Sequence, residues 1–432
     1  MRARSWIARF VGLALLAPWS ATAGPRATSP GGNARTGEGA RVLLIDIDDV
    51  GFDLLRDAPT PALDWIEANG RFYTSFTTGP QCTMTRSMLM TGAYGSHPDV
   101  LVGNTIRGDS TYAMPLAPLV PLPALVVGAG RTTAKVGKWH LAPRAQREHV
   151  RQAGWQSYAG VQLNLGNGGT FTYSRFPKVI NGVEAVEEGT YLTTDETNDG
   201  IRCVLAGIDL VSVSYHAPHT PFHVPPPDLH SILDTTSDRD KARAMLQALD
   251  RELGRLVRVA LEHDYTVLVF SDNGTALSIG GQKGTLFDGS IVTPMWAIGP
   301  GVVPGVDGSR VGVVDLYATV AELLGVAAGG AARGPHSRSF VRSLAGLPEE
   351  RRWTYAERFQ ENGVDPDGGT NPWRKTARGA RYKLVSERWG QGERLYDLWA
   401  NPSETYDLLT GPPLQPAAAA ALAEFRRVLS RL

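Results

Sequence analysis

Oxygen-bearing polar residues follow two apolar stretches of the sequence, where they could hold a metal ion. Asp48 and Asp49 follow RVLLIDI (41–47), and Asp272 and Asn273 follow YTVLVFS. Carboxylate and amide oxygens suit Ca2+ or Mg2+ better than a structural zinc ion. Three buried carboxylates would be costly to hold together without a cation, because like charges disfavour ionisation. Each pair alone is typical of turns and caps, but the two together predict one divalent cation site.

A second set of residues is basic or can become so. It comprises Arg86, Lys138, His140, His219 and Lys283. The chain has 43 Lys and Arg against 43 Asp and Glu, so its net charge gives no field that would favour nucleic acid or an acidic membrane. Basic side chains that converge locally would instead bind an anionic group of a substrate. In GKWHL, Lys138 and His140 alternate about Trp139 on a strand-like stretch, so their side chains are expected to point the same way.

One of the two cysteines lies in PQCTMTRSMLMTG (80–92). If a helix begins near Thr83, Cys82 stands at its N-terminus, where free N–H groups and the helix dipole favour negative charge. Arg86 lies one turn further on the same face. The helix end, Arg86 and the predicted cation all favour the thiolate, and together they predict a nucleophile with a lowered thiol pKa. The alternative is a disulfide with Cys203, although Cys203 stands at an apolar helix position typical of a buried free thiol.

Buried strands alternating with helices are predicted to bring these residues to one edge of a sheet. Strands are expected within 41–47, 131–141, 207–216, 265–274 and 294–301, and helices within 60–70, 240–264 and 313–325. This alternation predicts an α/β fold with a large, mostly parallel sheet flanked by helices on both faces. In such sheets the site lies outside the carboxyl ends of the strands.

The two ends of the chain differ in composition from its centre. Residues 1–23 have the basic start, short apolar run and small residues of a signal peptide, and the Gly/Pro/Ser-rich stretch 24–40 is typical of a disordered lead-in. The apolar run is too short to span a bilayer stably. We therefore expect an exported protein, periplasmic or secreted, with a catalytic domain over 41–330 and a small C-terminal α+β subdomain over 331–432.

The motifs, taken in order, resemble the sulfatase family of the alkaline phosphatase-like superfamily, of the formylglycine-dependent type. The resemblance extends from about residue 40 to 410. It rests on LLIDIDDVGFD, CTMTRSMLMTG, GKWHL, APHTPFHVP, VLVFSDNG with GQKGTLFDGSIVTP, and RLYDLWANPSETYDLL. It implies a sulfatase-like catalytic domain that cleaves a sulfate monoester, of an aryl or carbohydrate substrate.

The resemblance also implies a role for each matching residue. Asp48, Asp49, Asp272 and Asn273 would hold one cation, usually calcium, together with the formylglycine made from Cys82 by a formylglycine-generating enzyme. The hydrate of that formylglycine would attack sulfur. Arg86 and Lys138 would stabilise the hydrate, and His140 would be the base in sulfate release. Lys138, His219 and Lys283 would bind the substrate, with His219 and Lys283 protonating the leaving oxygen.

Two residues differ from the family signature. Met84 stands at its proline position, and Thr85 stands at its serine position and keeps a hydroxyl. In the family the proline helps the modifying enzyme recognise the cysteine, so Met84 weighs against formylglycine at Cys82. Two alternatives stay open: a phosphate or phosphonate monoester hydrolase of the same superfamily, and a non-catalytic protein that binds sulfated ligands.

Overall fold

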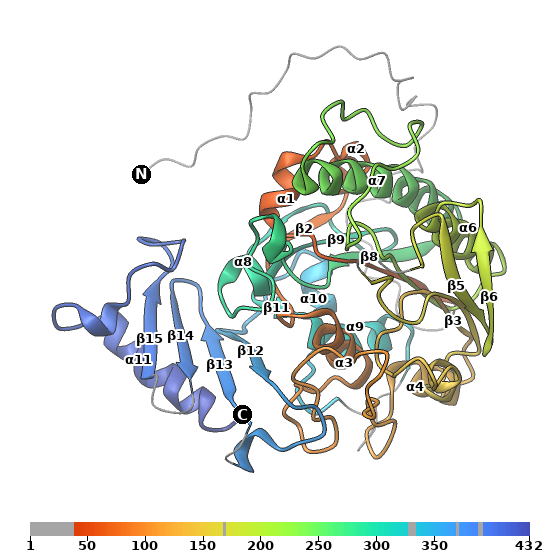
Figure 1. Cartoon of the computed structure of the whole chain (residues 1–432). Helices are drawn as coiled ribbons and strands as arrows, with labels where there is room; N and C mark the ends of the chain where they lie inside the picture. Colours follow the sequence, from red (N-terminus) through yellow and green to blue (C-terminus); the bar gives the residue numbers. More distant parts are fainter. Residues whose placement is uncertain (1–38, 167–169, 327–333, 369–370, 388–391) are drawn as a thin grey trace.

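The computed structural model describes residues 39–432 apart from 167–169, 327–333, 369–370 and 388–391 (Figure 1). The predicted signal peptide (1–23) and all but the last two residues of the predicted lead-in (24–40) lie outside the described residues. Among the helices that are described, none combines the length and the apolar character needed to cross a membrane.

A large sheet of eleven strands forms the centre of the molecule (Figure 1). Its strands are β1 (Arg41–Ile47), β2 (Arg71–Thr77), β3 (Thr133–Gly137), β4 (Ser157–Gly160), β5 (Arg175–Ile180), β6 (Val183–Glu188), β7 (Leu210–Ser214), β8 (Tyr265–Ser271), β9 (Val292–Ile298), β10 (Gly305–Asp307) and β11 (Val311–Gly312). The order is β10-β2-β9-β8-β1-β7-β3-β4-β5-β6, with β11 paired to β2. The strands around β1 run parallel, as the pattern predicted. The predicted strand at 294–301 is β9, which runs antiparallel to β8.

Helices cover both faces of this sheet, with α2, α6 and α7 on one side and α3, α4 and α9 on the other (Figure 1). The helices of the large part are α1 (Phe52–Asp57), α2 (Pro61–Asn69), α3 (Cys82–Thr91), α4 (Leu122–Gly128), α5 (His149–Gln152), α6 (Leu192–Leu205), α7 (Asp238–Glu262), α8 (Asp288–Ile291), α9 (Val313–Leu323) and α10 (Val341–Leu344). Side chains of β1 alternate between the two faces: Leu43 and Ile45 pack on the α7 side, and Leu44 packs on the α3 side. The central strands are therefore apolar on both faces.

A second, antiparallel sheet of four strands lies beside the large one (Figure 1). It consists of β12 (Thr354–Phe359), β13 (Trp373–Arg378), β14 (Tyr382–Glu387) and β15 (Gly392–Asp397), and the last helix, α11 (Pro416–Leu429), packs on β13 and β14. The large sheet with its helices and this small α+β part confirm the predicted fold class. Thr77 of β2 donates a hydrogen bond to Thr354 of β12 at 2.8 Å, which joins the two sheets.

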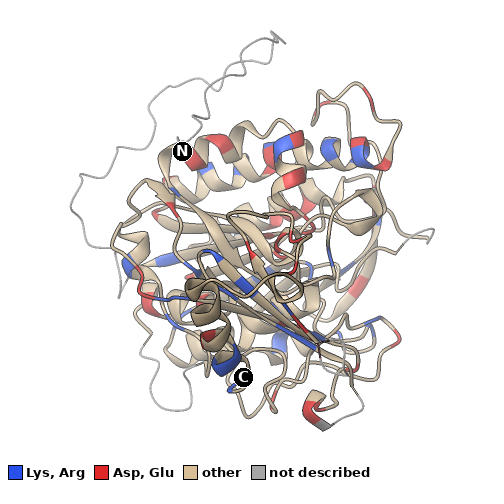
Figure 2. Cartoon of the chain, turned by 90° about the vertical axis from the view of Figure 1, so that its left-hand side faces the viewer, with Lys and Arg blue, Asp and Glu red and all other residues tan. Residues whose placement is uncertain are grey.

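Charged residues of both signs are interspersed over the molecule, as the zero net charge suggested. Figure 2 shows basic and acidic residues alternating along α7, the long helix at the top of that view. Specific recognition of a charged ligand must therefore depend on a local arrangement of side chains.

Candidate active site

The acidic residues that follow β1 and β8 lie together because these two strands are neighbours in the sheet. Asp48, Asp49, Asp272 and Asn273 are all buried. The backbone N–H of Asp49 donates to Asp272 Oδ1 at 3.2 Å, and Asn273 Nδ2 donates to Asp49 Oδ1 at 2.7 Å. The parallel register thus delivers all four residues to the carboxyl edge of the sheet.

The backbone at Asp49 has a left-handed conformation, with φ at 68°. This conformation is uncommon for a residue other than glycine. It is stabilised here by two backbone hydrogen bonds to the end of β8: the bond from Asp49 to Asp272, and one from the N–H of Val50 to Ser271 Oγ at 3.0 Å. The turn after β1 is therefore built to direct consecutive carboxylates toward β8.

Two lysines and the cysteine contact these carboxylates. Lys138 Nζ donates to Asp48 Oδ2, and Lys283 Nζ donates to Asp49 Oδ1. Cys82 Sγ lies 3.2 Å from Asp48 Oδ1 and 3.2 Å from Lys283 Nζ. The predicted nucleophile, the first acidic pair and two of the predicted cations therefore form one cluster.

The donor atoms of this cluster could hold a metal ion. Ligand atoms of Asp48, Asp49, Cys82 and His219 lie within 4.8 Å of one another. Among the described residues, Asn273 Oδ1 is buried and has no hydrogen-bond partner, although the Nδ2 of the same amide is bonded. An unsatisfied buried oxygen beside three carboxylates fits a hard cation. His219 was predicted as a substrate ligand and proton donor but not as a metal ligand, and its Nε2 lies 4.0 Å from Asp49 Oδ2.

Two buried carboxylates of the site, Asp48 and Asp272, differ in the direction in which their pKa is shifted. Burial would raise the pKa of Asp48, but Lys138, His219 and Lys283 together hold it well below its usual range. Burial and the neighbouring charge of Asp48 raise the pKa of Asp272 to about 8. A divalent ion bound here would offset the burial of Asp272 and the charge of Asp48, and would thus stabilise the ionised form of Asp272.

Cys82 is the first residue of α3, one position before the expected helix start. All ten residues of α3 are buried. Thr85 Oγ1 accepts from the N–H of Gly79 at 2.9 Å and donates to the carbonyl of Asp272 at 2.5 Å, so this hydroxyl ties the helix to β8. Gly92 ends the helix with φ at 61°, and its N–H donates to Met88 O.

Both cysteines are free, which excludes the alternative of a disulfide between Cys82 and Cys203 in this structure. Cys203 lies on α6 as a free thiol, as predicted, but it is half-buried and not buried. The lowered pKa predicted for the Cys82 thiol included the effect of a bound cation, and the side chains of the site alone do not produce it. Burial together with the charges of Asp272 and Asp48 raises this pKa well above its usual value, and Lys138 and Lys283 oppose that shift only in part.

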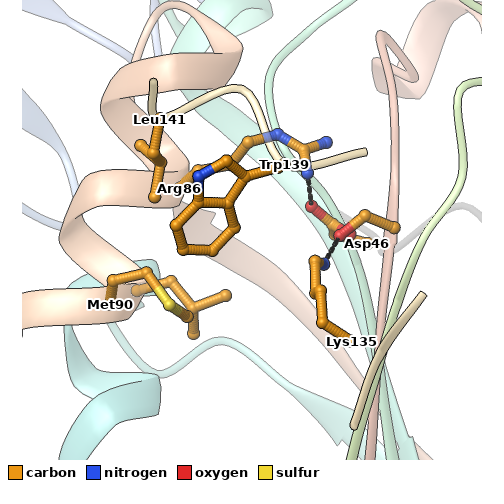
Figure 3. A pocket seen from close by; sticks show the side chains of 8 residues that line it. Asp46, Arg86, Met90, Lys135, Trp139 and Leu141 are labelled. Atoms are coloured by element: carbon orange, nitrogen blue, oxygen red, sulfur yellow. Dashed lines mark hydrogen bonds and ion pairs between the residues drawn. The ribbon is translucent and has the colours of Figure 1, made fainter. Parts of the chain in front are cut away.

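The guanidinium of Arg86 lies between two carboxylates. Its Nη2 is 3.5 Å from Asp272 Oδ2, and its Nη1 is 3.0 Å from Asp46 Oδ2 and donates to the carbonyl of Lys138 at 3.0 Å. Figure 3 shows the ion pair between Asp46 and Arg86, which both line a small pocket together with Trp139. These carboxylates raise the pKa of Arg86, against burial, which keeps it charged.

Asp46 was not predicted as a site residue, because it was counted among the residues of an apolar strand. Lys135 of β3 lines the same pocket, and its Nζ donates to Ser212 Oγ at 3.0 Å and to Ser214 Oγ. Burial lowers the pKa of Lys135 to about 7, although Asp46 opposes this shift. Asp46 and Lys135 could have been found from the sequence as single charged residues within otherwise apolar strands, because an unpaired charge is costly to bury there.

The isosteric substitution Asp46→Asn is expected to lower kcat or metal affinity by about 10–100-fold, the usual effect of losing a residue that orients a ligand of the site. Arg86 would lose its closer carboxylate partner, keep Asp272 at 3.5 Å, and shift from its present position. Steady-state kinetics and calorimetric metal titration measure the effect. Ser212→Ala, which removes a neutral partner of Lys135, is the matched control; equal effects of both variants would contradict the role of Asp46.

The two predicted histidines lie on loops at this edge. β3 ends at Gly137, so Lys138 and His140 are not on a strand as predicted, and His140 has φ at 60°. Lys138 still faces Asp48, and Trp139 points away, toward His149 Nδ1 at 3.1 Å. Burial, with the charges of Lys138 and Arg86, lowers the pKa of His140 well below its usual value. His140 is therefore a neutral imidazole.

His219 follows β7 and is also neutral. Burial lowers its pKa to about 4, although Asp48 and Asp49 oppose that shift. Its Nδ1 lies 3.0 Å from the carbonyl of Thr220, which indicates that this nitrogen carries the proton and that Nε2 faces the acidic cluster. An anion bound next to His219 would raise its pKa, because negative charge favours the imidazolium form.

Comparison with known proteins places this geometry in a family. The Sulfatase family profile matches residues 40–326, which is more than half of the chain. The chain is 28% identical over 281 residues to arylsulfatase J of Mus musculus, a match that covers 58% of this chain and 46% of that protein. It is 27% identical over 327 residues to N-acetylgalactosamine-6-sulfatase of Sus scrofa, covering 66% of this chain and 62% of that protein. The matches thus span less than two thirds of the length of these relatives.

A solved structure, that of Ps i-CgsB in complex with k-i-k-neocarrahexaose, has the same fold. It superposes with a TM-score of 0.75 at 21% sequence identity and covers 91% of this chain and 92% of its own. The matched residues 40–326 include the acidic pairs after β1 and β8, the cysteine at the start of α3, and the lysines and histidines around them. The chain belongs to the sulfatase family.

Proposed function

We propose that the protein is a sulfuric ester hydrolase. The observation that carries this proposal is the position of Cys82: it begins α3, and its Sγ lies 3.2 Å from both Asp48 Oδ1 and Lys283 Nζ. A nucleophile derived from this residue would meet a substrate at a point where cations can stabilise charge on the sulfuryl oxygens. Membership of the sulfatase family supports the same reaction.

The proposed reaction requires a bound divalent cation and the modification of Cys82 to formylglycine. Asp48, Asp49, Asp272 and Asn273 would hold one divalent cation, with calcium favoured by the oxygen donors. This cation would act as a Lewis acid toward a sulfuryl oxygen. Oxidation of Cys82 to formylglycine would supply, through its hydrate, two hydroxyl groups where a thiol supplies one sulfur atom.

Side chains of the chain would then bind the sulfate and move protons. Burial would lower the pKa of Lys283, but Asp49 and the Cys82 position raise it well above its usual value, so this residue stays cationic and can bind a sulfate oxygen. His219, once its pKa is raised by the bound anion, would protonate the leaving oxygen. His140, neutral and buried, would accept a proton during release of sulfate.

The proposed substrate is an aryl or carbohydrate sulfate. Relatives of the chain include an arylsulfatase and an N-acetylgalactosamine-6-sulfatase. The solved neighbour Ps i-CgsB binds k-i-k-neocarrahexaose, and another, BT4656, was determined with its substrate D-glucosamine-2-N,6-O-disulfate at a TM-score of 0.67 and 16% identity. The basic, apolar and small-residue segments within 1–23 support the further proposal that the protein is exported to the periplasm or secreted.

Release of sulfate tests the proposed reaction. Purified protein, produced together with a formylglycine-generating enzyme and supplied with Ca2+, should release sulfate from 4-nitrophenyl sulfate or a sulfated sugar. Faster release of phosphate from 4-nitrophenyl phosphate would favour a phosphate monoester hydrolase. Tight binding of sulfated sugars without turnover by the modified protein would favour a non-catalytic binding protein.

Met84→Pro is expected to raise the fraction of Cys82 that is converted to formylglycine. Met84 is the third residue of α3, a position whose N–H has no acceptor within the helix, so proline can be placed there. Loss of the buried methionine side chain should cost about 2–5 kcal/mol of stability. Peptide mass spectrometry measures the converted fraction. Met84→Ala makes the same cavity without proline; an equal rise in both variants would show that recognition of proline is not the cause.

A further inference from the structure

One arginine of the small sheet reaches the loop that carries Lys283. Arg358 lies on β12, is half-buried, and donates from Nη1 to the carbonyl of Gly284. A Cβ atom placed on Gly284 would lie 3.2 Å from Arg358 Nη1 and 3.9 Å from Gln81 Nε2. Arg358 and Gln81, from separate parts of the chain, therefore meet at the backbone of Gly284.

The backbone of Gly284, where Arg358 and Gln81 meet, lies next to the segment that carries the proposed nucleophile, Cys82. Gln81 directly precedes Cys82, and Gln81 Oε1 accepts from Thr105 Oγ1 at 3.2 Å. The N–H of Gly284 donates to the carbonyl of Pro80 at 2.9 Å, so the Lys283 loop is fastened to the segment before α3. Arg358 therefore contacts the residue that follows Lys283, and this contact lies beside Gln81, the residue that precedes Cys82.

The charge of Arg358 is not compensated by a carboxylate among the residues described. Its partner across the β12–β13 ladder is Arg374, which lies 3.7 Å from Glu387. Burial and the charge of Arg374 lower the pKa of Arg358. A half-buried guanidinium next to a like charge is unfavourable unless an anion binds it. With one donor engaged by Gly284, the other N–H groups of its fork can bind a sulfate or carboxylate group.

We propose that Arg358 forms a second anion subsite beside the sulfate-cleaving centre, which selects sulfated oligosaccharides with a further sulfate or carboxylate group over singly charged esters. This inference rests on the proposed function, since it assigns a substrate class to the same site. It adds a specificity-determining residue from the small sheet to a centre built by the large one.

The first test compares selectivity in the loaded enzyme. The ratio of kcat/KM for a disulfated disaccharide to that for its monosulfated counterpart should fall in Arg358→Gln by about 10–100-fold, the effect of losing one charge-assisted hydrogen bond. A monosulfated disaccharide with a uronic acid distinguishes carboxylate from sulfate as the second group. Arg374→Gln removes the same charge from the neighbouring strand and should leave the ratio near that of the wild type. An unchanged ratio in Arg358→Gln, or an equal fall in both variants, would overturn the subsite.

The second test separates this inference from the proposed reaction. Calorimetry measures binding of the same three disaccharides to Cys82→Ala protein, which requires no turnover. Preference for a doubly charged disaccharide that disappears with Arg358→Gln supports the subsite even if the wild type releases no sulfate, in which case only the proposed function fails. Equal binding of singly and doubly charged disaccharides, or binding of none of them, contradicts the subsite even if the wild type is an active sulfatase.

Discussion

Cys82→Ala is expected to abolish hydrolysis of sulfate esters, with a loss in kcat of at least about 10³-fold, as when a nucleophile is removed. The substituted residue lies at the centre of the cluster, in contact with Asp48 and Lys283. Alanine cannot be converted to formylglycine and provides no nucleophile. The fold should persist, because removal of one buried sulfur leaves α3 with its other nine residues in place.

Cys82→Ser distinguishes loss of the attacking group from loss of the second hydroxyl that releases sulfate. Serine keeps one hydroxyl, so it could attack sulfur once, release the alcohol and form a serine sulfate ester. It has no second hydroxyl on the same carbon, so it cannot expel the sulfate as the formylglycine hydrate does. We expect little turnover and less than one sulfate released per protein molecule. Sulfate release, followed over time by ion chromatography, measures both variants. Sustained turnover by Cys82→Ala would refute the assignment of Cys82 as the nucleophile precursor.

Asp272→Ala is expected to weaken binding of the divalent cation by more than about 100-fold and to abolish turnover. Loss of a residue that only orients a metal ligand costs about 10–100-fold in affinity, and loss of a ligand itself should cost at least as much. Asp272 Oδ1 accepts the N–H of Asp49, and its Oδ2 faces Arg86, so the carboxylate joins the two strand ends around which the cation would bind. Its removal leaves Asp48 and Asp49 as the remaining acidic donors after β1.

Elemental analysis of the purified protein, with calorimetric titration of Ca2+ and Mg2+, measures this effect. The wild type should contain one calcium or magnesium ion per chain. Asp315→Asn is a suitable control, because Asp315 is buried and ion-paired with Arg351 outside this cluster. Stoichiometric zinc in the wild type, or full metal content in Asp272→Ala, would contradict the oxygen-ligated site.

The central strands could be predicted because they are continuous apolar runs. β1, β7 and β8 each lie within an expected stretch, and their adjacency in the sheet explains why residues far apart in sequence converge. β12 and β13 were not predicted, because their residues alternate with charged ones and are stabilised by pairing across the small sheet. The expected continuation of β3 through His140 fails where the chain turns into the left-handed region.

The acidic and basic sets of the site could be predicted from residue type and position after a strand. The pKa of Cys82 could not, because it depends on how closely Asp48 and Asp272 approach the sulfur once it is buried. Asp46 could not be predicted, because it lies within the apolar run of β1 and its ion pair with Arg86 joins residues far apart in the sequence. Arg358 could not, because its contact with Gly284 joins residues 74 positions apart.

The chemical state of Cys82 decides whether this residue is the precursor of the nucleophile. Protein purified from its native host should be digested, and the peptide that contains Cys82 analysed by mass spectrometry, with an aldehyde-reactive probe as a second readout. We expect a peptide in which one oxygen has replaced the sulfur and two hydrogens of Cys82, in an amount proportional to the specific activity of the sample. A fully active protein in which Cys82 is present only as an unmodified thiol, or as a disulfide with Cys203, would contradict this expectation.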